Sequence, residues 1–183
     1  MPKLIAAALL ILAASAPVRV VDLDGRSVDP FQATAGAKAV VFLFTATDCP
    51  ISNRYAPEIQ RLYRAYADRG VKFVLIYPNP ADTPPMIREH ARSFGYPAEA
   101  WRDPRQALAK AAQVTIAPEA AVFVQGRLVY HGRIDDRFVD FGIDRPQPTV
   151  HDLDDAIAAV LAGKPVPHPV TQAVGCYLAD YAR

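Results

Sequence analysis

The fold is decided by residues 45–59, which read T-A-T-D-C-P-I-S-N-R-Y-A-P-E-I, together with the apolar runs that flank them. Residues 38–45 and 71–77 are short, apolar and rich in β-branched and aromatic side chains, which is typical of buried central strands. Apolar side chains recur at helical spacing over residues 51–69, and Gly70 follows them. A strand, a helix and a strand in this order join two parallel strands through a right-handed crossover. We therefore expect an α/β domain.

The rest of the chain predicts two hairpins and three further helices. Weak alternation around Asp24-Gly25 predicts a short hairpin or edge strand in residues 18–31. The turn Gln125-Gly126 predicts antiparallel pairing of residues 120–124 with residues 128–130. The expected helices cover residues 84–94 with Thr83 as cap, residues 104–113, and residues 151–161 with Thr149 as cap.

The composition describes one globular domain without a charged binding face. Of the 183 residues, 51% are hydrophobic, and 20 Lys and Arg residues nearly balance 19 Asp and Glu residues, leaving a formal net charge of +1. The apolar content excludes a disordered chain, and the balanced charge argues against a nucleic-acid partner. The two cysteines are too few for a four-cysteine zinc site, and the four histidines show no paired metal-ligand spacing, so we expect no metal site.

Residues 1–16 have the pattern of a secretory signal peptide. Lys3 precedes an unbroken apolar run over residues 4–14, and Ala14-Ser15-Ala16 offers small residues to a signal peptidase. This run of about 11 residues is shorter than the roughly 20 that a membrane-spanning helix needs. Pro17 is unfavourable directly after the cleavage site, so an uncleaved N-terminal anchor is the alternative. We expect a periplasmic or secreted protein without stable membrane insertion, in a compartment that permits disulfides.

Cys49 occupies the point where a strand ends and a helix begins. Unpaired backbone N–H groups and the helix dipole stabilise an anion there, which would lower the pKa of the thiol. Pro50 suits the first helical turn because it has no N–H to leave unpaired, and Pro57 should kink the helix. The carboxylate of Asp48 opposes ionisation of the thiol unless it turns to solvent or to Arg54. Alternatively, Cys49 is a small buried apolar residue.

Together with this cysteine, three further features resemble a known family. Pro118 opens a hairpin, residues 128–136 read L-V-Y-H-G-R-I-D-D, and a late Gly-Cys pair ends at Cys176. With the order of the elements, they resemble the thioredoxin fold. Within it they are similar to exported members of the redoxin or peroxiredoxin-like group of the alkyl hydroperoxide reductase/thiol-specific antioxidant superfamily. The resemblance covers residues 18–176. It implies a central mixed β-sheet flanked by helices, a cis bond before Pro118, and backbone groups of Ala117 that pair with a bound thiol or peptide.

The sequence departs from thioredoxins at the active site. Thioredoxins have C-x-x-C, whereas residues 49–52 read C-P-I-S. Ser52 can hydrogen-bond a thiolate at Cys49 but cannot close a disulfide, so a mixed disulfide at Cys49 would persist until another thiol arrives. Arg54 could steer an anionic group or stabilise a thiolate, or it belongs to a solvated helix face.

The sequence also departs from the peroxidase subgroup of the family. Members of that subgroup have proline seven residues and threonine or serine three residues before the reactive cysteine, and an arginine that polarises the peroxide. Phe42 and Ala46 occupy the first two positions here. Arg133 is the candidate for the arginine, and a surface ion pair with Asp135 or Asp136 is the alternative.

Cys176 lies in a C-terminal extension, residues 164–183, which follows the expected domain at residues 17–163. It could resolve an oxidised Cys49, which requires the extension to cross the active site. It could instead form a static disulfide that pins the tail, which would stabilise the fold by roughly 4 to 5 kcal/mol in the chain-entropy model. It could also stay unpaired or pair between chains.

These observations predict a thiol oxidoreductase that needs no organic cofactor, because the electrons reside in sulfur. The substrate would be a disulfide or a peroxide, and the reductant a protein or small-molecule thiol. A peroxiredoxin-like peroxidase is one alternative, and a non-catalytic module that binds peptides along the Pro118 edge is another. The expected catalytic residues are Cys49 as nucleophile, Cys176 as possible resolving thiol, Pro118 and Arg133, and the expected substrate-binding residues are Asp48, Pro50, Ser52, Arg54 and Ala117.

Overall fold

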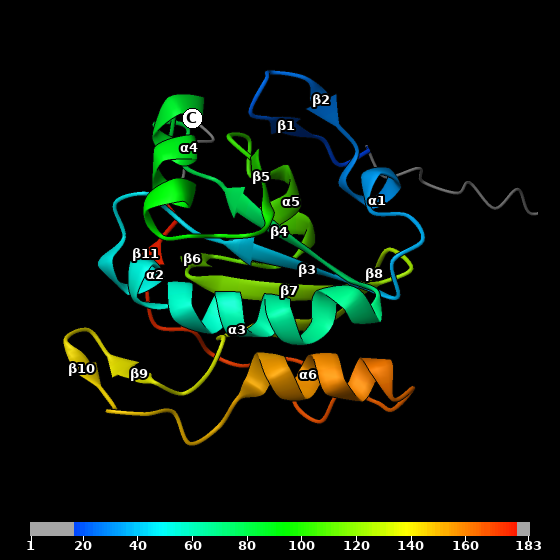
Figure 1. Ribbon diagram of the computed structural model, residues 1–183, viewed down its shortest axis with the longest axis vertical. Helices are drawn as coiled ribbons and strands as arrows, with labels where there is room; N and C mark the ends of the chain where they lie inside the picture. Colours follow the sequence, from blue (N-terminus) through cyan, green and yellow to red (C-terminus); the bar gives the residue numbers. More distant parts are fainter. Residues whose placement is uncertain (1–16, 179–183) are drawn as a thin grey trace, which may run out of the picture.

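The computed structural model describes residues 17–178, whose main feature is a seven-stranded sheet with helices on both faces (Figure 1). In spatial order its strands are β2 (Ser27–Val28), β1 (Val20–Asp22), β5 (Glu99–Arg102), β4 (Val71–Tyr77), β3 (Ala39–Phe44), β7 (Glu119–Val124) and β8 (Arg127–Gly132). The pairs β3·β4 and β4·β5 are parallel, whereas the other neighbouring pairs are antiparallel. This is the mixed central sheet that the sequence predicts.

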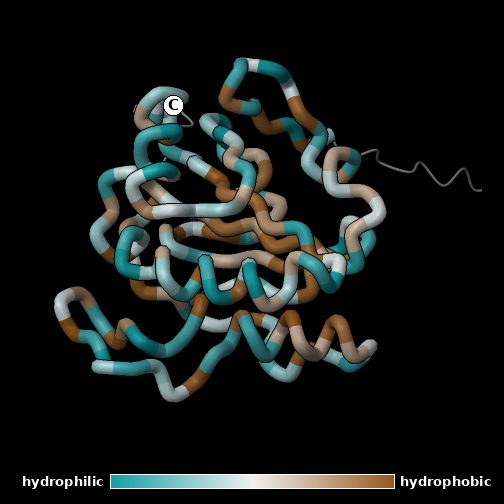
Figure 2. The backbone as a smooth tube through the Cα atoms, viewed as in Figure 1, coloured by the Kyte–Doolittle hydropathy of each residue, from teal (hydrophilic) through white to brown (hydrophobic). Residues whose placement is uncertain are grey.

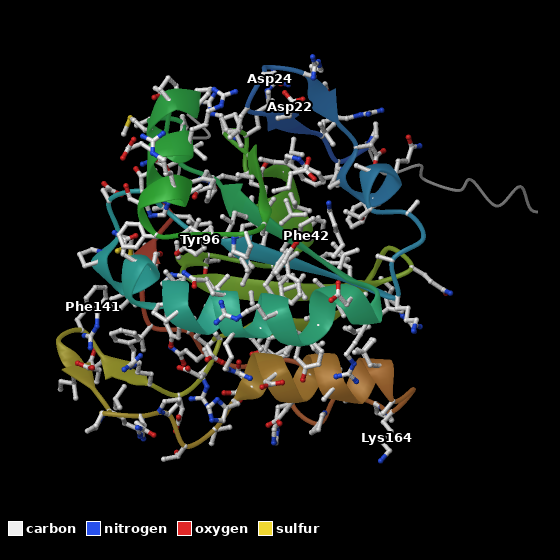
Figure 3. All side chains as sticks on the ribbon, viewed as in Figure 1. Asp22, Asp24, Phe42, Tyr96, Phe141 and Lys164 are labelled. Atoms are coloured by element: carbon white, nitrogen blue, oxygen red, sulfur yellow. The ribbon has the colours of Figure 1, made fainter. Side chains whose placement is uncertain are left out.

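Two apolar layers cover the sheet because successive residues of β3 point to opposite faces. Val41 and Leu43 pack on one face with side chains of α3 (Ala56–Tyr66), α4 (Pro84–Ser93) and α6 (Asp152–Leu161). Val40 and Phe42 pack on the other face with α5 (Ala107–Ala111) and the short α1 (Pro30–Ala33). All six residues of β3 are buried, which explains why this strand reads as a continuous apolar run. Figure 2 shows the apolar strands inside the molecule, and Figure 3 places Phe42 at its centre.

The expected helix over residues 51–69 is broken, and this is the main local difference from the sequence analysis. α2 (Pro50–Arg54) ends after five residues, Tyr55 separates the two helices, and α3 begins at Ala56. Pro57 stands in the first turn of α3, where its missing N–H leaves no hydrogen bond unmade, so it starts a new helix rather than kinking one. The dipole that faces Cys49 is therefore that of a very short helix, and its effect on the sulfur is smaller than a long helix would give. The end is as expected: a 3-10 turn, η1 (Ala67–Arg69), leads to Gly70 at φ +94°.

Three other boundaries differ from the expectation. The sequence pattern does not predict β5, because its residues, E-A-W-R, are too few and too polar to show a strand pattern. α5 covers only the middle of the helix expected over residues 104–113. Thr149 does not cap α6: His151 holds the cap position, and the hydroxyl of Thr149 donates to Asp136 Oδ2 at 2.6 Å.

Two small sheets complete the fold. β9 (Phe138–Asp140) pairs with β10 (Ile143–Asp144), and β6 (Ile116–Ala117) pairs with β11 (Cys176–Tyr177). The chain reaches β11 along the edge strand β8, since His131 N–H donates to the Pro169 carbonyl at 3.0 Å and Thr171 N–H donates to the His131 carbonyl at 3.2 Å. The C-terminal extension therefore packs onto the sheet.

The expected signal peptide, residues 1–16, lies outside the described residues. Between residues 17 and 178, no helix combines the length and the apolar character that crossing a membrane requires.

Candidate functional site

Cys49 is buried where the loop after β3 enters α2. It occupies the N-cap position of α2, and only 1% of its surface is exposed. Its thiol donates to the backbone carbonyl of Ala117, with 3.4 Å between Sγ and the oxygen. The sulfur is therefore oriented by the backbone of β6 rather than by a neighbouring side chain.

The Ala117–Pro118 peptide bond is cis, which confirms the prediction from the resemblance. β6 ends at Ala117, and β11 lies antiparallel to it with Cys176 directly opposite Ala117. Leu178 N–H extends this pairing by donating to the Thr115 carbonyl at 2.9 Å. The same two-residue strand thus meets the sulfur of Cys49 through its carbonyl and the segment of Cys176 through its backbone. β11 and α2 lie at one end of the sheet in Figure 1.

Two glycines allow the extension to lie this close. A Cβ at Gly175 would stand 2.2 Å from the Ala117 carbonyl oxygen, and a Cβ at Gly132 would stand 2.2 Å from Thr171 Oγ1. Real Cβ contacts are never so short, so both positions require glycine. The hydroxyl of Thr171 then lies 2.8 Å from that of Tyr130 and accepts from the backbone N–H of Arg133 at 3.1 Å. These contacts fix the path of the chain before it reaches Cys176.

The two thiols differ in environment. Both cysteines are free in this structure, and Cys176 is the more exposed of the two. Burial raises the pKa of the Cys176 thiol to about 12, with further contributions from its hydrogen bond with Cys49, from the charge of Cys49 and from the charge of Asp48. Cys176 is therefore protonated at neutral pH. The pairing of Cys176 with Ala117, whose carbonyl accepts from the Cys49 thiol, brings the two cysteines together across 127 residues of sequence.

Ser52, which stands where a C-x-x-C motif has its second cysteine, faces inward. Only 1% of its surface is exposed, and its hydroxyl has no hydrogen-bond partner among the described residues. It forms no hydrogen bond to Cys49 in this structure. The other thiol among the described residues is that of Cys176 on β11.

The two candidate arginines are engaged elsewhere. Arg54 pairs with Asp144 on β10, at 2.5 Å between Nη2 and Oδ2, and its guanidinium lies over the ring of Phe138. Arg133 binds Asp152 in the first turn of α6, at 2.6 Å between Nε and Oδ2, rather than Asp135 or Asp136. Both arginines thus hold peripheral segments to the domain.

Asp48 and Pro50 are exposed beside the two cysteines. A pocket of about 240 Å³ opens next to β11, and its lining includes Ala46, Asp48, Asn79, Gln106, Ala117 and Cys176. The site therefore contains a small pocket that is lined by Cys176 and not by Cys49.

Sequence reasoning missed the buried polar groups around the site. His90 lies between Tyr77 and Asn53, with its Nδ1 2.8 Å from the tyrosine hydroxyl and its Nε2 2.7 Å from Asn53 Oδ1, and burial lowers its pKa. Asp82 accepts from the Thr47 hydroxyl at 2.5 Å, and burial raises its pKa. The only signal in the sequence is a polar residue beside apolar ones, which does not distinguish these positions from surface positions.

Glu119 follows the cis proline and is buried, and its Oε1 lies 3.3 Å from His131 Nδ1. Burial raises the pKa of the carboxyl group, and the interactions with His131 oppose the rise. The pair lies on two neighbouring strands, β7 and β8, which the hairpin turn at Gln125-Gly126 brings together.

A group with metal-ligand side chains occurs elsewhere among residues 17–178. Glu58, Asp135 and His151 bring one ligand-type atom each to within 4.8 Å of one another. Arg61 binds both carboxylate oxygens of Glu58, and Tyr55 and the Arg137 N–H bind Oδ1 of Asp135. Hydrogen bonds thus account for the two carboxylates of this group.

Comparisons with known proteins agree with this arrangement. The Redoxin family model matches residues 13–157, which is most of the chain. An uncharacterized conserved protein from Geobacillus kaustophilus has a similar structure, with 29% identity, a TM-score of 0.75 and coverage of 89% of this chain and 88% of that one. A hypothetical protein from Sinorhizobium meliloti 1021 matches with 25% identity and a TM-score of 0.74, over 94% of this chain and 95% of that one.

More distant structures share the fold. A secreted Mycobacterium tuberculosis disulfide oxidoreductase, described as homologous to E. coli DsbE, has 17% identity and a TM-score of 0.51, over 80% of this chain and 96% of that one. No curated protein sequence matches the chain. The buried cysteine at a helix start, the cis peptide bond after Ala117, whose carbonyl accepts from the thiol, and the Redoxin match lead to one conclusion: the chain belongs to the Redoxin family, has the thioredoxin-like fold and is of the thiol oxidoreductase type.

Proposed function

We propose that the protein is a thiol–disulfide oxidoreductase in which Cys49 and Cys176 interconvert between a dithiol and a disulfide. The pairing of β11 with β6 carries this proposal, because it holds Cys176 opposite the residue whose carbonyl binds the Cys49 thiol. A strand that places a thiol at this point supplies the resolving group that the C-P-I-S sequence lacks.

The environments of the sulfur atoms support an order of events. A thiol with a pKa near 12 is a poor first nucleophile at neutral pH, so Cys49 makes the first attack on the substrate disulfide, and because only 1% of its surface is exposed, the substrate reaches it when β11 moves away. One substrate sulfur leaves as a thiolate, and a mixed disulfide forms on Cys49. Cys176 then loses its proton and attacks Cys49 Sγ, which releases the second substrate thiolate. The substrate gains two electrons and the protein holds the Cys49–Cys176 disulfide.

Peroxide reduction is less well supported. Phe42 and Ala46 stand where peroxidases of this family have proline and a hydroxyl residue, and Arg133 is bound to Asp152. The arrangement around Cys49 resembles a disulfide-exchange site more than a peroxide site.

Export of the protein is part of this proposal. The signal-like residues 1–16 would direct the chain to an oxidising compartment, where the disulfide form persists until a reductant meets it. Fractionation of cells that produce the full chain tests this: the proposal expects the protein outside the cytoplasm.

Peptide mapping of the oxidised protein by mass spectrometry tests the pairing. We expect one intramolecular link between the Cys49 and Cys176 peptides, formed with a mild disulfide oxidant and removed by excess thiol. A Cys176→Ser variant should retain the oxidant as a stable mixed disulfide on Cys49. A Ser52→Ala variant is the matched control near Cys49 and should form the link normally. Oxidised protein that lacks the link, or has it only between chains, contradicts the proposal.

A further inference from the structure

We propose that the reductant of the Cys49–Cys176 disulfide is a low-molecular-weight thiol carrying an ammonium group, which enters the pocket beside β11 and attacks Cys176. This inference rests on the proposed function, since it presupposes that disulfide. It adds which sulfur reacts with the reductant and which class of reductant the site selects.

The size of the pocket favours a small molecule. Its volume of about 240 Å³ lies below the range of roughly 300–1,000 Å³ that is usual for drug-sized ligands. β11 meanwhile covers the β6 edge, where an extended peptide would otherwise pair with Ala117. A partner protein would have to displace β11, whereas a small thiol needs only the open pocket.

The position of the pocket determines which sulfur atom of the disulfide the reductant attacks. Cys176 lines the pocket and is partly exposed, whereas Cys49 does not line it and is 1% exposed. Which sulfur of a disulfide is attacked depends on the access of the incoming thiolate as well as on the leaving thiol. An incoming thiolate in this pocket reaches Cys176 Sγ first.

The charge of the pocket determines which class of small-molecule thiol it favours. Asp48 is exposed and is the charged side chain among the lining residues of the described chain. The nearby Arg54 is held by Asp144 at 2.5 Å, which leaves its charge largely compensated. A negative carboxylate at the mouth of a small pocket attracts an ammonium group and repels a sulfonate or carboxylate.

The reaction balances with two molecules of the thiol. The first thiolate forms a bond to Cys176 Sγ, the disulfide bond breaks, and Cys49 leaves with the electron pair as a thiolate. A second thiolate attacks the small-molecule sulfur of the mixed disulfide and releases Cys176 as a thiolate. Two protons from solvent or from the ammonium thiols restore the dithiol, and the product is the disulfide of the small thiol.

Reduction rates with three thiols of equal chain length test the selection. The probes are cysteamine, 2-mercaptoethanol and 2-mercaptoethanesulfonate, which carry a positive, a neutral and a negative group. Rates of disulfide loss are measured by stopped flow at low ionic strength and expressed per thiolate. We expect cysteamine to exceed the sulfonate by on the order of three- to tenfold, which is the ratio a nearby unit charge supports in a partly solvated site. Asp48→Asn should reduce the ratio to below about twofold, and 0.5 M salt should do the same.

Asp24→Asn is the matched control, because Asp24 is an exposed carboxylate on the β1–β2 turn, paired with Arg88 (Figure 3). It should leave the ratio unchanged. Early acid quenching followed by peptide mapping should find the first mixed disulfide on Cys176.

Three results would overturn the inference: equal rates per thiolate for the three probes, an early adduct on Cys49, or reduction by a thioredoxin-type protein dithiol that exceeds cysteamine per thiolate. Each presupposes that the disulfide has formed. Failure of the disulfide to form would instead refute the proposed function, so the two failures are distinguishable.

Discussion

Gly175→Ala is the substitution that separates the position of β11 from the chemistry of the sulfur atoms. A Cβ at residue 175 would stand 2.2 Å from the Ala117 carbonyl oxygen and 2.8 Å from Ile116 Cγ2. To reach the 3.4 Å of an ordinary contact, the strands must separate by about 1.2 Å. The hydrogen bond from Leu178 N–H to the Thr115 carbonyl, now 2.9 Å, would lengthen to about 4 Å, which is beyond hydrogen-bonding range.

The free-energy cost of losing this hydrogen bond follows from the usual contribution of a backbone hydrogen bond. A backbone hydrogen bond contributes about 0.5–1.5 kcal/mol, so the loss of this bond weakens the docking of β11 by about 0.5–1.5 kcal/mol. A change of 1.4 kcal/mol is tenfold in an equilibrium constant, so we expect the disulfide to form about two- to tenfold more slowly in the variant. The thiols themselves are unaltered, and residues remote from β11 keep their packing.

The assay follows the appearance of the Cys49–Cys176 link after mixing with excess oxidised dithiothreitol, by acid quench and mass spectrometry. Gly163→Ala is the control, because a Cβ at that residue has no neighbour within 4 Å, although its φ of +66° makes the substitution mildly strained. It should change stability slightly and the rate of disulfide formation not at all. Unchanged kinetics in Gly175→Ala would refute the claim that the pairing of β11 with β6 positions Cys176.

Three further outcomes follow from the structure. In Cys49→Ser, burial keeps the pKa of Cys176 above its usual value, so iodoacetamide should modify Cys176 slowly at pH 8 and quickly once urea unfolds the protein; equally fast modification of the folded protein would contradict the raised pKa. Burial opposes the charge of Asp136, but hydrogen bonds from Thr149 and Val150 outweigh it and lower its pKa to about 2, so the stability it supplies is present above pH 4 and is lost as the pH falls toward 2. Urea unfolding at pH 5 and pH 2.5 should show a loss on the order of 1–2 kcal/mol that Asp136→Asn lacks, and an identical acid response in both proteins would refute it. Arg54→Ala should leave the rate of disulfide formation unchanged and cost at most about 1 kcal/mol of stability, because Arg54 forms a surface pair with Asp144; a tenfold slower rate would place Arg54 in the chemistry.

The sequence predicts the centre of the fold because strands that are buried on both faces consist of continuous apolar residues. β3 and β4 are apolar on both faces and match the expected strands almost residue for residue, and the hairpin of β7 and β8 follows from its Gln-Gly turn. The cis bond at Pro118 follows from the resemblance rather than from these patterns, whereas the position of Cys49 at a helix start follows from the strand and helix patterns themselves.

The periphery is less predictable because tertiary contacts decide it. The hydroxyl of Tyr55, the residue between α2 and α3, donates to Asp135 Oδ1 at 2.7 Å, a contact that no local pattern reports. The sequence pattern predicts that Thr149 caps a helix. In the structure, its N–H donates to Asp136 Oδ1 and its hydroxyl donates to Asp136 Oδ2. Arg133 pairs with Asp152 because α6 lies beside β8. The carboxylate of Asp152 therefore binds the guanidinium in place of Asp135 or Asp136, which are nearer in sequence.

The meeting of the two cysteines is a long-range outcome. Cys49 and Cys176 are separated by 127 residues, and only the glycine before Cys176 hints that the chain passes close to another backbone there. The sequence leaves several partners open for Cys176, whereas the pairing of β11 with β6 favours one.

A redox titration of the folded protein tests the central claim most directly. Samples equilibrated over a range of reduced to oxidised dithiothreitol ratios are alkylated and mapped, and the fraction with the Cys49–Cys176 link is plotted against potential. We expect one reversible two-electron transition, at a potential above the roughly −300 mV typical of structural disulfides, and its loss in Cys49→Ser and in Cys176→Ser. A disulfide that never forms, or one that stays intact at every ratio, would contradict the claim that these two sulfur atoms interconvert between a dithiol and a disulfide.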